Sequence, residues 1–304
     1  MFFRRKDIVE VELVGGLGNQ LFLYFAALYY AIKFEKELII DLSQIPLGMT
    51  NHGSEITSFR INQISKLKKS SAFYPSRIAK RFLNWISIKD KKIRFLRLRM
   101  TGVYQSPQVG FDEYINSTDG ILRLQGYYQT WYYIDELKKL GHRNNLELQA
   151  PSIWFIEQQK EMKLKKSVAI HVRRGDYKNE KNPIGLLSSG YYAEAIEKVY
   201  NLSPDSTFWI FSDEINEARA LLSDLLPGNT NWVVEPKNSD PAESLMLMSM
   251  ADIVITANSS FSWWAAKLGK SKEHVICPKP WFKNMEIPLN LIPDSWQEVK
   301  STWS

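Results

Sequence analysis

The chain is predicted to be an α/β protein made of two Rossmann-like domains that face each other across a cleft. Two stretches, 8–41 and 167–277, alternate short apolar runs typical of buried strands with segments of helical period. A glycine-rich turn directly follows the first apolar run, as in doubly wound nucleotide-binding sheets. The 304 residues suffice for two domains of about 100 to 200 residues each. The polar stretch 141–151 is the best boundary, which gives a first domain over 1–150 and a second domain over 151–304.

The first half opens with a strand, a glycine turn, a helix and a second strand, the start of a parallel sheet. The basic stretch after it is expected to be helical. The expected elements are a strand over 8–14, a turn over 15–18, a helix over about 20–36, and strands over 37–41 and 121–125.

The second half repeats the alternation with shorter segments. Ligands of such sheets bind at the carboxyl ends of the strands, so functional residues are expected just after strands. The expected strands are 167–172, 207–211, 232–234, 252–256 and 274–277, and the expected helices are 191–200, 214–226, 241–250 and 260–268.

Composition excludes several classes of protein. The longest apolar run, 21–32, has 12 residues, well short of the roughly 20 needed to span a bilayer. Acidic residues appear near the start, before any apolar region typical of a secretory signal. The single Cys277 cannot form an internal disulfide, and the four histidines lack ligand spacing for zinc. We therefore expect a cytoplasmic protein without a disulfide partner or a metal.

Positive charge is concentrated in one segment. Between Arg60 and Arg99 there are 13 Lys or Arg residues and one acid, Asp90, with aromatic residues between them. Such a segment can lie against an anionic membrane at the inner face of the plasma membrane, or face an anionic acceptor. The alternative is a solvated basic face on ordinary helices.

The first candidate site is the turn GGLGNQ after the first strand. Its glycines allow close approach of a ligand to the backbone. As a dinucleotide fingerprint it is incomplete, because Leu21 stands where a third small residue is expected. A purely structural turn is the alternative. The candidate ligand-binding residues here are Gly16, Gly18, Asn19 and Gln20.

The second candidate is HVRRGDY at the end of the strand 167–172. Strand alternation puts His171 and Arg173 on one face, and an arginine at that place can give a bidentate, permanently charged fork to a diphosphate. Asp176 can anchor the arginine pair or the turn. A surface ion pair is the alternative interpretation.

Two further candidates also follow strands. Asp213, in FSDE, is either a site residue or a simple helix N-cap. The sequence ANSSFSWW brings hydroxyls and free amides to the start of a helix, where phosphate binds well. Its alternative is capping by Asn258 or Ser259, with Trp263 and Trp264 as core residues.

Some motifs are absent from the sequence. There is no D-x-D to hold a divalent cation on a diphosphate, no phosphate-binding P-loop and no G-x-S-x-G nucleophile motif. If a sugar nucleotide is the substrate, arginine, helix ends and hydroxyls must neutralise the leaving diphosphate without a metal.

Together the motifs resemble one enzyme family. GGLGNQLF, GYYQT, HVRRGDY, FSDE, ITANSSFSWWAAKLG and PKPWF occur in the order and spacing of the bacterial α-1,2-fucosyltransferases, glycosyltransferase family 11, within the superfamily carrying H-x-R-R-x-D. The resemblance implies a GT-B fold, in which the acceptor-binding domain is 1–150 and the GDP-sugar-binding domain is 151–304. It also implies GDP-fucose as donor, a galactoside or lipid-linked oligosaccharide as acceptor, inversion at the anomeric carbon and no metal. It also implies a bacterial enzyme of surface glycan (O-antigen or capsule) synthesis.

The resemblance assigns roles residue by residue. Arg173 would stabilise the departing GDP at the β-phosphate, His171 would lie near the guanosine, and Asn19 would lie beside the fucose and acceptor. The implied catalytic residues are Arg173, Asn19 and Asp176; the implied donor-binding residues are His171, Arg173, Arg174, Asp213, Glu243, Asn258, Ser259, Ser260 and Phe261; the acceptor side has Gly16, Gly18, Asn19 and Gln20.

Two points stay open. The family usually has an acid that reads guanine at the position of Ser244, so either the neighbouring Glu243 takes this role or base recognition is altered. No general base for the acceptor hydroxyl is identified, although Asp41, His52, Asp112 and Glu113 lie in the acceptor half.

Other function classes compete with a fucosyltransferase. A dehydrogenase on the first βαβ unit would bind NAD, and Leu21 argues against it. A non-catalytic binder of nucleic acid or another anionic surface would use 60–99 but leaves HVRRGDY unexplained, so no nucleic-acid partner is expected. Within the transferases, another deoxysugar or linkage is the alternative.

Overall fold

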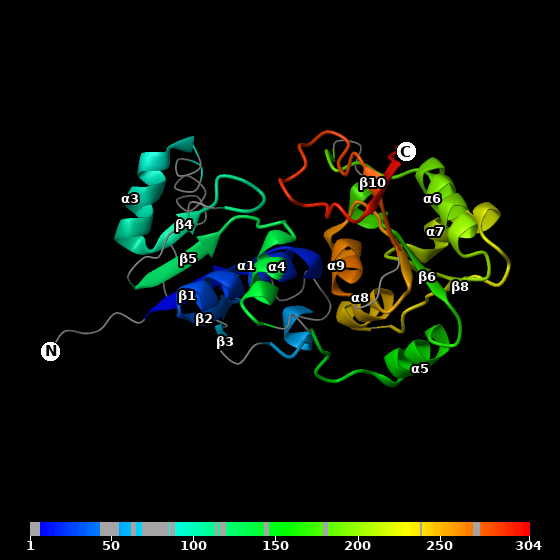
Figure 1. Cartoon of the computed structure of the whole chain (residues 1–304), viewed down its shortest axis with the longest axis horizontal. Helices are drawn as coiled ribbons and strands as arrows, with labels where there is room; N and C mark the ends of the chain where they lie inside the picture. The colour runs from blue at the N-terminus through cyan, green and yellow to red at the C-terminus, as the bar shows by residue number, and fades with distance from the viewer. Residues whose placement is uncertain are drawn as a thin grey trace. The chain divides into compact units, whose positions relative to one another are not determined.

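The protein folds into two compact units, each an α/β structure (Figure 1). The first unit is Met1–Leu146 with Pro288–Leu291, and the second is Glu147–Ile287 with Ile292–Ser304. The computed structural model describes residues 7–42, 55–61, 65–68, 85, 89–112, 115, 120–142, 146–178, 182–237, 239–269 and 274–304. The predicted α/β class with parallel sheets is confirmed.

The first unit contains a parallel sheet. Its described strands are ordered β3-β2-β1-β5-β4, and each pairing is parallel. Helix α1 connects β1 to β2, which is the predicted opening. The elements are β1 (Ile8–Glu12), α1 (Leu17–Lys33), β2 (Glu37–Asp41), a short 3-10 helix (Glu55–Ser58), β3 (Ser65–Lys68), α3 (Lys91–Thr101), β4 (Val103–Gln105), β5 (Ile121–Gln125) and α4 (Tyr132–Lys139).

Helix α1 forms the core of the first unit. Its sequence LGNQLFLYFAALYYAIK is apolar on nearly all sides, and a helix of this kind is buried rather than amphipathic. Every residue from Gln20 to Ala31 is buried. The hydroxyl of Tyr30 donates to the Asp112 carbonyl at 2.7 Å, so the one polar end of this ring has a partner.

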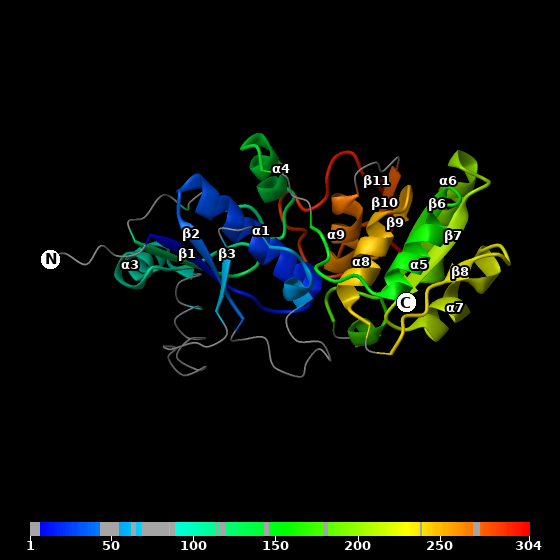
Figure 2. The same ribbon diagram turned by 90° about the horizontal axis from the view of Figure 1, so that it is seen from below.

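The second unit contains a larger parallel sheet. Its described strands are ordered β11-β10-β9-β6-β7-β8. Helices α8 and α9 lie side by side (Figure 2). The elements are α5 (Ile153–Met162), β6 (Ser167–Val172), α6 (Ser189–Leu202), β7 (Thr207–Ser212), α7 (Ile215–Leu222), β8 (Asn231–Trp232), α8 (Pro241–Ser249), β9 (Ile253–Ile255), α9 (Ser260–Leu268), β10 (His274–Lys279) and β11 (Gln297–Lys300), with 3-10 helices at Gly175–Lys178 and Ser223–Leu225.

The strand order reverses next to β6. From β6 the chain adds β7 and β8 on one side, and then returns to add β9, β10 and β11 on the other. The loops after β6 and β9 therefore leave the same edge of the sheet in opposite directions. Such a switch point is where open α/β sheets bind ligands.

The basic stretch differs from its prediction. Residues 65–68 form strand β3 rather than a helix, because they pair with the edge of β2, with Lys66 opposite Ile39. Positive side chains are common on edge strands, where they oppose pairing with another chain. Helix α3 agrees with the helical prediction, and 62–64, 69–84 and 86–88 lie outside the described residues. None of the described helices is long and apolar enough to cross a membrane.

Candidate functional site

The predicted donor-side residues gather at the carboxyl edge of the second sheet. Arg173 follows β6, Asp213 follows β7, and Asn258 to Ser260 follow β9, which lies beside β6. Their neighbourhood arises from the parallel order of the strands, since the carboxyl ends of parallel strands meet at one edge.

Two carboxylates hold the Arg173 guanidinium. Its Nε and Nη2 donate to Asp176 Oδ1 at 3.0 and 2.8 Å, and its Nη1 lies 3.2 Å from Asp213 Oδ2. Burial favours a lower pKa for Arg173, but the charges of Asp213 and Asp176 outweigh it and raise the pKa. Of the five guanidinium N–H donors, two remain for an anion. The side chain keeps 31% of its surface exposed, so a ligand can reach it.

Asp213 joins the loops after β6 and β7. Its Oδ1 accepts from the Arg174 backbone N–H at 2.9 Å. Glu214, not Asp213, is the N-cap of α7, so the interpretation of Asp213 as a simple cap is wrong. A Cβ on Gly175 would lie 2.5 Å from Asp213 Oδ2, which explains why the R-R-G-D turn has a glycine there. Arg174 anchors the next loop by donating to the Leu187 carbonyl at 3.0 Å.

His171 is buried at the end of β6. It is 3% exposed, and its Nδ1 has no hydrogen-bond partner among the described residues. Its ring lies 5.5 Å from that of Phe261. Burial, with the nearby Arg173 charge, lowers the pKa of His171 to about 3. His171 is therefore neutral near pH 7 and has an unused polar atom beside the predicted donor site.

The loop after β9 is held by side chains of other elements. Ser259 is the N-cap of α9 and accepts from the Phe261 N–H at 3.3 Å. The Asn258 amide donates to the carbonyls of Ile184 and Gly185, both at 3.0 Å. The capping interpretation is therefore correct for Ser259, whereas Asn258 fixes the loop before α6. Ser260 and Phe261 begin α9 and are both partly exposed.

Sequence reasoning missed three tyrosines that support these loops. Tyr177 OH lies 3.4 Å from the Asn258 carbonyl, and its ring lies 5.6 Å from the Arg173 guanidinium carbon. Tyr191 donates to the Thr256 carbonyl at 2.7 Å, and Tyr192 donates to the His171 carbonyl at 3.1 Å. The final Y of HVRRGDY was a signal for Tyr177. No such signal marks Tyr191 and Tyr192, because they donate to backbone carbonyls that are distant in the sequence.

The acid at the start of α8 is engaged elsewhere. Glu243 is buried, and its two carboxylate oxygens accept from the Ser152 N–H at 2.5 Å and the Ser152 hydroxyl at 2.7 Å. The Ser244 hydroxyl instead donates to Glu235 Oε1, while Ser239 donates to Glu235 Oε2 at 2.9 Å. Glu235, shortly after β8, is exposed. The accessible carboxylate beside Ser244 is therefore that of Glu235.

The predicted acceptor-side residues belong to the first unit. Gln20 is fully buried; its Nε2 donates to the Gly15 carbonyl at 2.9 Å and its Oε1 accepts from Ile56 N–H at 3.3 Å. Gly18 is buried in α1. Asn19 is partly exposed and accepts from Gln129 Nε2 at 2.8 Å, while Gly16 is exposed. Of the four, Gly16 and Asn19 are accessible, and Gln20 shapes the turn.

Two candidate bases are inaccessible. Asp41 and Asp112 are both fully buried, and Asp112 Oδ2 accepts from the Tyr104 hydroxyl at 2.9 Å and the Ser106 hydroxyl at 3.0 Å. An acceptor sugar cannot reach either carboxylate. His52 and Glu113 lie outside the described residues.

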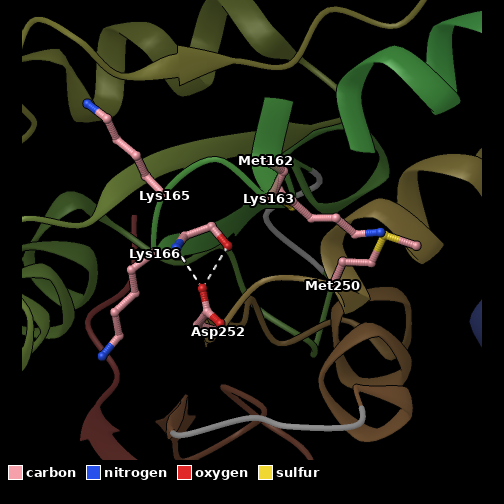
Figure 3. Close-up of a pocket in the computed structure, with 7 residues that line it drawn as sticks. Met162, Lys163, Lys165, Lys166, Met250 and Asp252 are labelled. Atoms are coloured by element: carbon pink, nitrogen blue, oxygen red, sulfur yellow. Dashed lines mark hydrogen bonds between the residues drawn. The ribbon is translucent and has the colours of Figure 1, made fainter. Parts of the chain in front are cut away.

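A cavity of about 400 Å³ lies at the opposite, amino edge of the second sheet (Figure 3). Asp252 accepts there from the Ser167 N–H at 2.8 Å. In Figure 3 the amino groups of Lys165 and Lys166 point away from Asp252. The lining contains none of the predicted site residues: it is Met162, Lys163, Lys165, Lys166, Ser167, Met250 and Asp252.

The chain is similar in sequence to two transferases of Escherichia coli. The chain is 26% identical to an α-1,2-colitosyltransferase of Escherichia coli over 97% of this chain and 99% of that protein. It is also 26% identical to the O-antigen biosynthesis glycosyltransferase WbnK of Escherichia coli, over 93% of this chain and 98% of that protein.

The fold resembles that of solved structures of a fucosyltransferase. The crystal structure of the fucosyltransferase NodZ from Bradyrhizobium matches with a TM-score of 0.52 and 14% identity, over 87% of this chain and 94% of that one. A NodZ α-1,6-fucosyltransferase crystal soaked with GDP-fucose matches with a TM-score of 0.52 and 15% identity, over 91% and 96%.

The family itself is established by the sequence as a whole. The model of "Glycosyl transferase family 11" matches residues 8–286, which include the turn after β1, the HVRRGDY loop and the start of α9. This protein is a member of glycosyltransferase family 11.

Proposed function

We propose that this chain transfers L-fucose from GDP-β-L-fucose to the 2-hydroxyl of a terminal galactoside, with inversion and without a metal ion, in bacterial surface glycan synthesis. The observation that carries the proposal is the Arg173 fork, held by Asp176 and Asp213 at the switch point of the second sheet. The name of the E. coli α-1,2-colitosyltransferase supports the linkage, that of WbnK supports the role in surface glycan synthesis, and the NodZ structure soaked with GDP-fucose supports the donor.

The proposed chemistry depends on the leaving group. When the bond between C1 of fucose and the diphosphate breaks, negative charge develops on the β-phosphate. The two unused N–H groups of Arg173 can donate to that oxygen, and the partly exposed Ser260 can add a hydroxyl. Donors that are already fixed in place stabilise such a charge by about 3 to 4 kcal/mol each. Asp176 and Asp213 therefore act as positioning residues.

The proposal includes a GT-B arrangement, in which the acceptor binds the first unit and the GDP-sugar binds the second. Gly16 and Asn19 would face the sugar and acceptor, since they are the accessible members of the turn after β1. The division of roles between the units is part of the proposal.

For the base of the nucleotide we propose Glu235 rather than Glu243. A guanine presents two neighbouring N–H donors, which a carboxylate accepts well. Both oxygens of Glu243 already accept from Ser152, whereas Glu235 is exposed and only held in place by Ser239 and Ser244. The serine at 244 thus positions an acid supplied by another loop.

The name of one relative indicates an alternative donor sugar. The E. coli protein is named an α-1,2-colitosyltransferase, and colitose differs from fucose by the missing 3-hydroxyl. GDP-colitose is therefore the alternative donor for the same site, with the same roles for Arg173 and Glu235.

A donor screen tests the proposal. GDP release by the full chain is measured with GDP-fucose, GDP-colitose or GDP-mannose, each with and without lactose, and the product linkage is determined by NMR. We expect lactose-dependent release with GDP-fucose and an α-1,2 linkage. Turnover of GDP-colitose alone would replace fucose as the donor. Release with GDP-mannose alone, or tight NADH binding without GDP release, would overturn the proposal.

A further inference from the structure

The outer face of α3 carries apolar side chains that the protein does not bury. Ile93, Leu96 and Met100 are 39%, 57% and 71% exposed. They are three and four residues apart, so they form one stripe along the helix. Trp85 lies just before α3 in the sequence and is 54% exposed. The other nine tryptophans, all within the described residues, are buried or partly buried.

The opposite face of the helix attaches it to the first unit. Arg94 and Leu98 are 6% and 7% exposed, and Arg97 Nη2 donates to Gln125 Oε1 at 3.3 Å. Asp90 caps the start of α3 by accepting from Lys92 and Ile93, and Gly102 ends it in the left-handed conformation. The helix is therefore fixed in orientation, and the apolar stripe is a stable feature of the surface.

Cations lie next to the stripe, along one side of it. Lys92 lies four residues before Leu96 and Arg99 three after it, so both lie next to it on the helix surface. Lys92 and Arg99 are exposed, as is Lys89, whose amino group is 4.7 Å from the centre of the Trp85 ring. Arg94, although part of the same basic sequence, is buried and does not contribute to this surface.

We propose that α3 and Trp85 form a binding surface for an anionic lipid bilayer. Leu96, Met100 and Trp85 would enter the boundary between headgroups and acyl chains, and Lys89, Lys92 and Arg99 would contact lipid phosphates. An apolar stripe with lysine and arginine flanks and a tryptophan is the pattern of helices that lie in the membrane interface. Positive charge along the stripe selects an anionic surface over a neutral one.

The first experiment separates insertion from charge. Flotation of the full chain is measured with vesicles rich in phosphatidylglycerol and with vesicles of phosphatidylcholine alone, at low and high salt. The double variant Leu96→Asp/Met100→Asp is expected to weaken binding to anionic vesicles by about tenfold or more. The matched control, Ile153→Asp/Leu164→Asp in the second unit, replaces side chains that are 76% and 79% exposed and should bind as the parent does.

The charges and the tryptophan give two independent readouts. Replacing Lys89, Lys92 and Arg99 by Gln should weaken binding at low salt and reduce its salt dependence, because exposed charges are screened within about 8 Å at physiological ionic strength. Tryptophan emission should shift to shorter wavelength on anionic vesicles, and Trp85→Phe should remove that shift.

Three outcomes would overturn the proposal. The first is no binding of the parent chain to anionic vesicles. The second is an equal loss of vesicle binding in Leu96→Asp/Met100→Asp and in its control. The third is a shift of tryptophan emission that persists in Trp85→Phe. A parent that self-associates, with Leu96→Asp/Met100→Asp monomeric, would assign the stripe to a second copy of the chain instead. GDP-fucose turnover with lactose is the folding control and is expected to be unchanged in all α3 variants. It is measured apart from vesicle binding, so a failure of the proposed activity is distinguished from a failure of the proposed membrane surface.

Discussion

Arg173 is the residue on which the proposed chemistry depends most. The planar guanidinium donates to Asp176 and approaches Asp213 while it keeps two N–H groups for phosphate. We expect Arg173→Lys to lower kcat by about a hundredfold to a thousandfold, because an ammonium cannot contact both carboxylates and the phosphate with the same geometry.

Steady-state GDP release and thermal unfolding of the variant measure this effect. Arg219→Lys in α7 is the matched control, since Arg219 stacks on Trp232 with its guanidinium carbon 4.6 Å from the ring centre. Turnover of Arg173→Lys within about tenfold of the parent would remove Arg173 from charge stabilisation.

His171 connects pH to stability. Its pKa is lowered from 6.5 to about 3 by burial and the Arg173 charge, so the unfolded chain binds a proton between these values that the folded chain does not. The stabilisation is complete above about pH 6.5 and is lost as pH falls toward 3, at up to about 1.4 kcal/mol per pH unit. Urea unfolding at pH 7 and pH 5 should therefore show a smaller loss of stability in His171→Asn than in the parent. An identical loss in both proteins would mean that His171 is protonated in the folded state.

The positions of the motif residues were predictable from the sequence, whereas their hydrogen-bond partners were not. Arg173, Asp213 and Ser259 lie at strand ends because the sequence places them after buried strands. The hydrogen bonds from Ser152 to Glu243 join residues 91 positions apart, and nothing local in the sequence indicates them. The same holds for Ser244 and Glu235, whose hydrogen bond joins α8 to the loop after β8.

Among elements, buried strands were the most predictable. SVAIHV and TFWIFS are nearly continuous apolar runs, and β6 and β7 lie where these runs predict them. Strands β4 and β11 were not predicted, because three and four residues are too few to show a clear period. Helices α4 and α5 were also missed, since no element was predicted between the strand 121–125 and the strand 167–172.

The loop after β6 offers a test of how the position of Asp213 affects turnover. A methyl group on Gly175 would meet Asp213 Oδ2 at 2.5 Å, so Gly175→Ala should push this carboxylate away from Arg173. We expect the fold to persist, because the clash is with the end of a side chain, and kcat to fall by about a hundredfold, as misplaced catalytic groups commonly cause.

Gly228→Ala is the control for this substitution, because a Cβ there meets no atom within 4 Å. GDP release and circular dichroism are measured for both variants. Parent-like kcat in Gly175→Ala would show that Asp213 does not need its present position.

For the whole molecule, the two α/β halves were predictable from the two alternations along the sequence. That Pro288–Leu291 belong to the first unit could not be predicted. It depends on contacts such as the hydrogen bond that the Thr130 hydroxyl donates to the Asn290 carbonyl at 2.8 Å. These four residues lie after the last predicted strand, in a stretch without periodicity. Assignment of the acceptor to one unit and the donor to the other stays a prediction.

Metal independence concerns how the complete enzyme neutralises a diphosphate. The sequence has no D-x-D, and the carboxylates of Asp176 and Asp213 are both paired with Arg173. Charge on the leaving GDP would therefore meet a guanidinium and hydroxyls already in place. Excess EDTA should leave GDP release from GDP-fucose unchanged within about twofold, a difference of about 0.4 kcal/mol in the barrier. A loss of activity that Mn²⁺ or Mg²⁺ restores would mean that a cation takes part of the role assigned to Arg173.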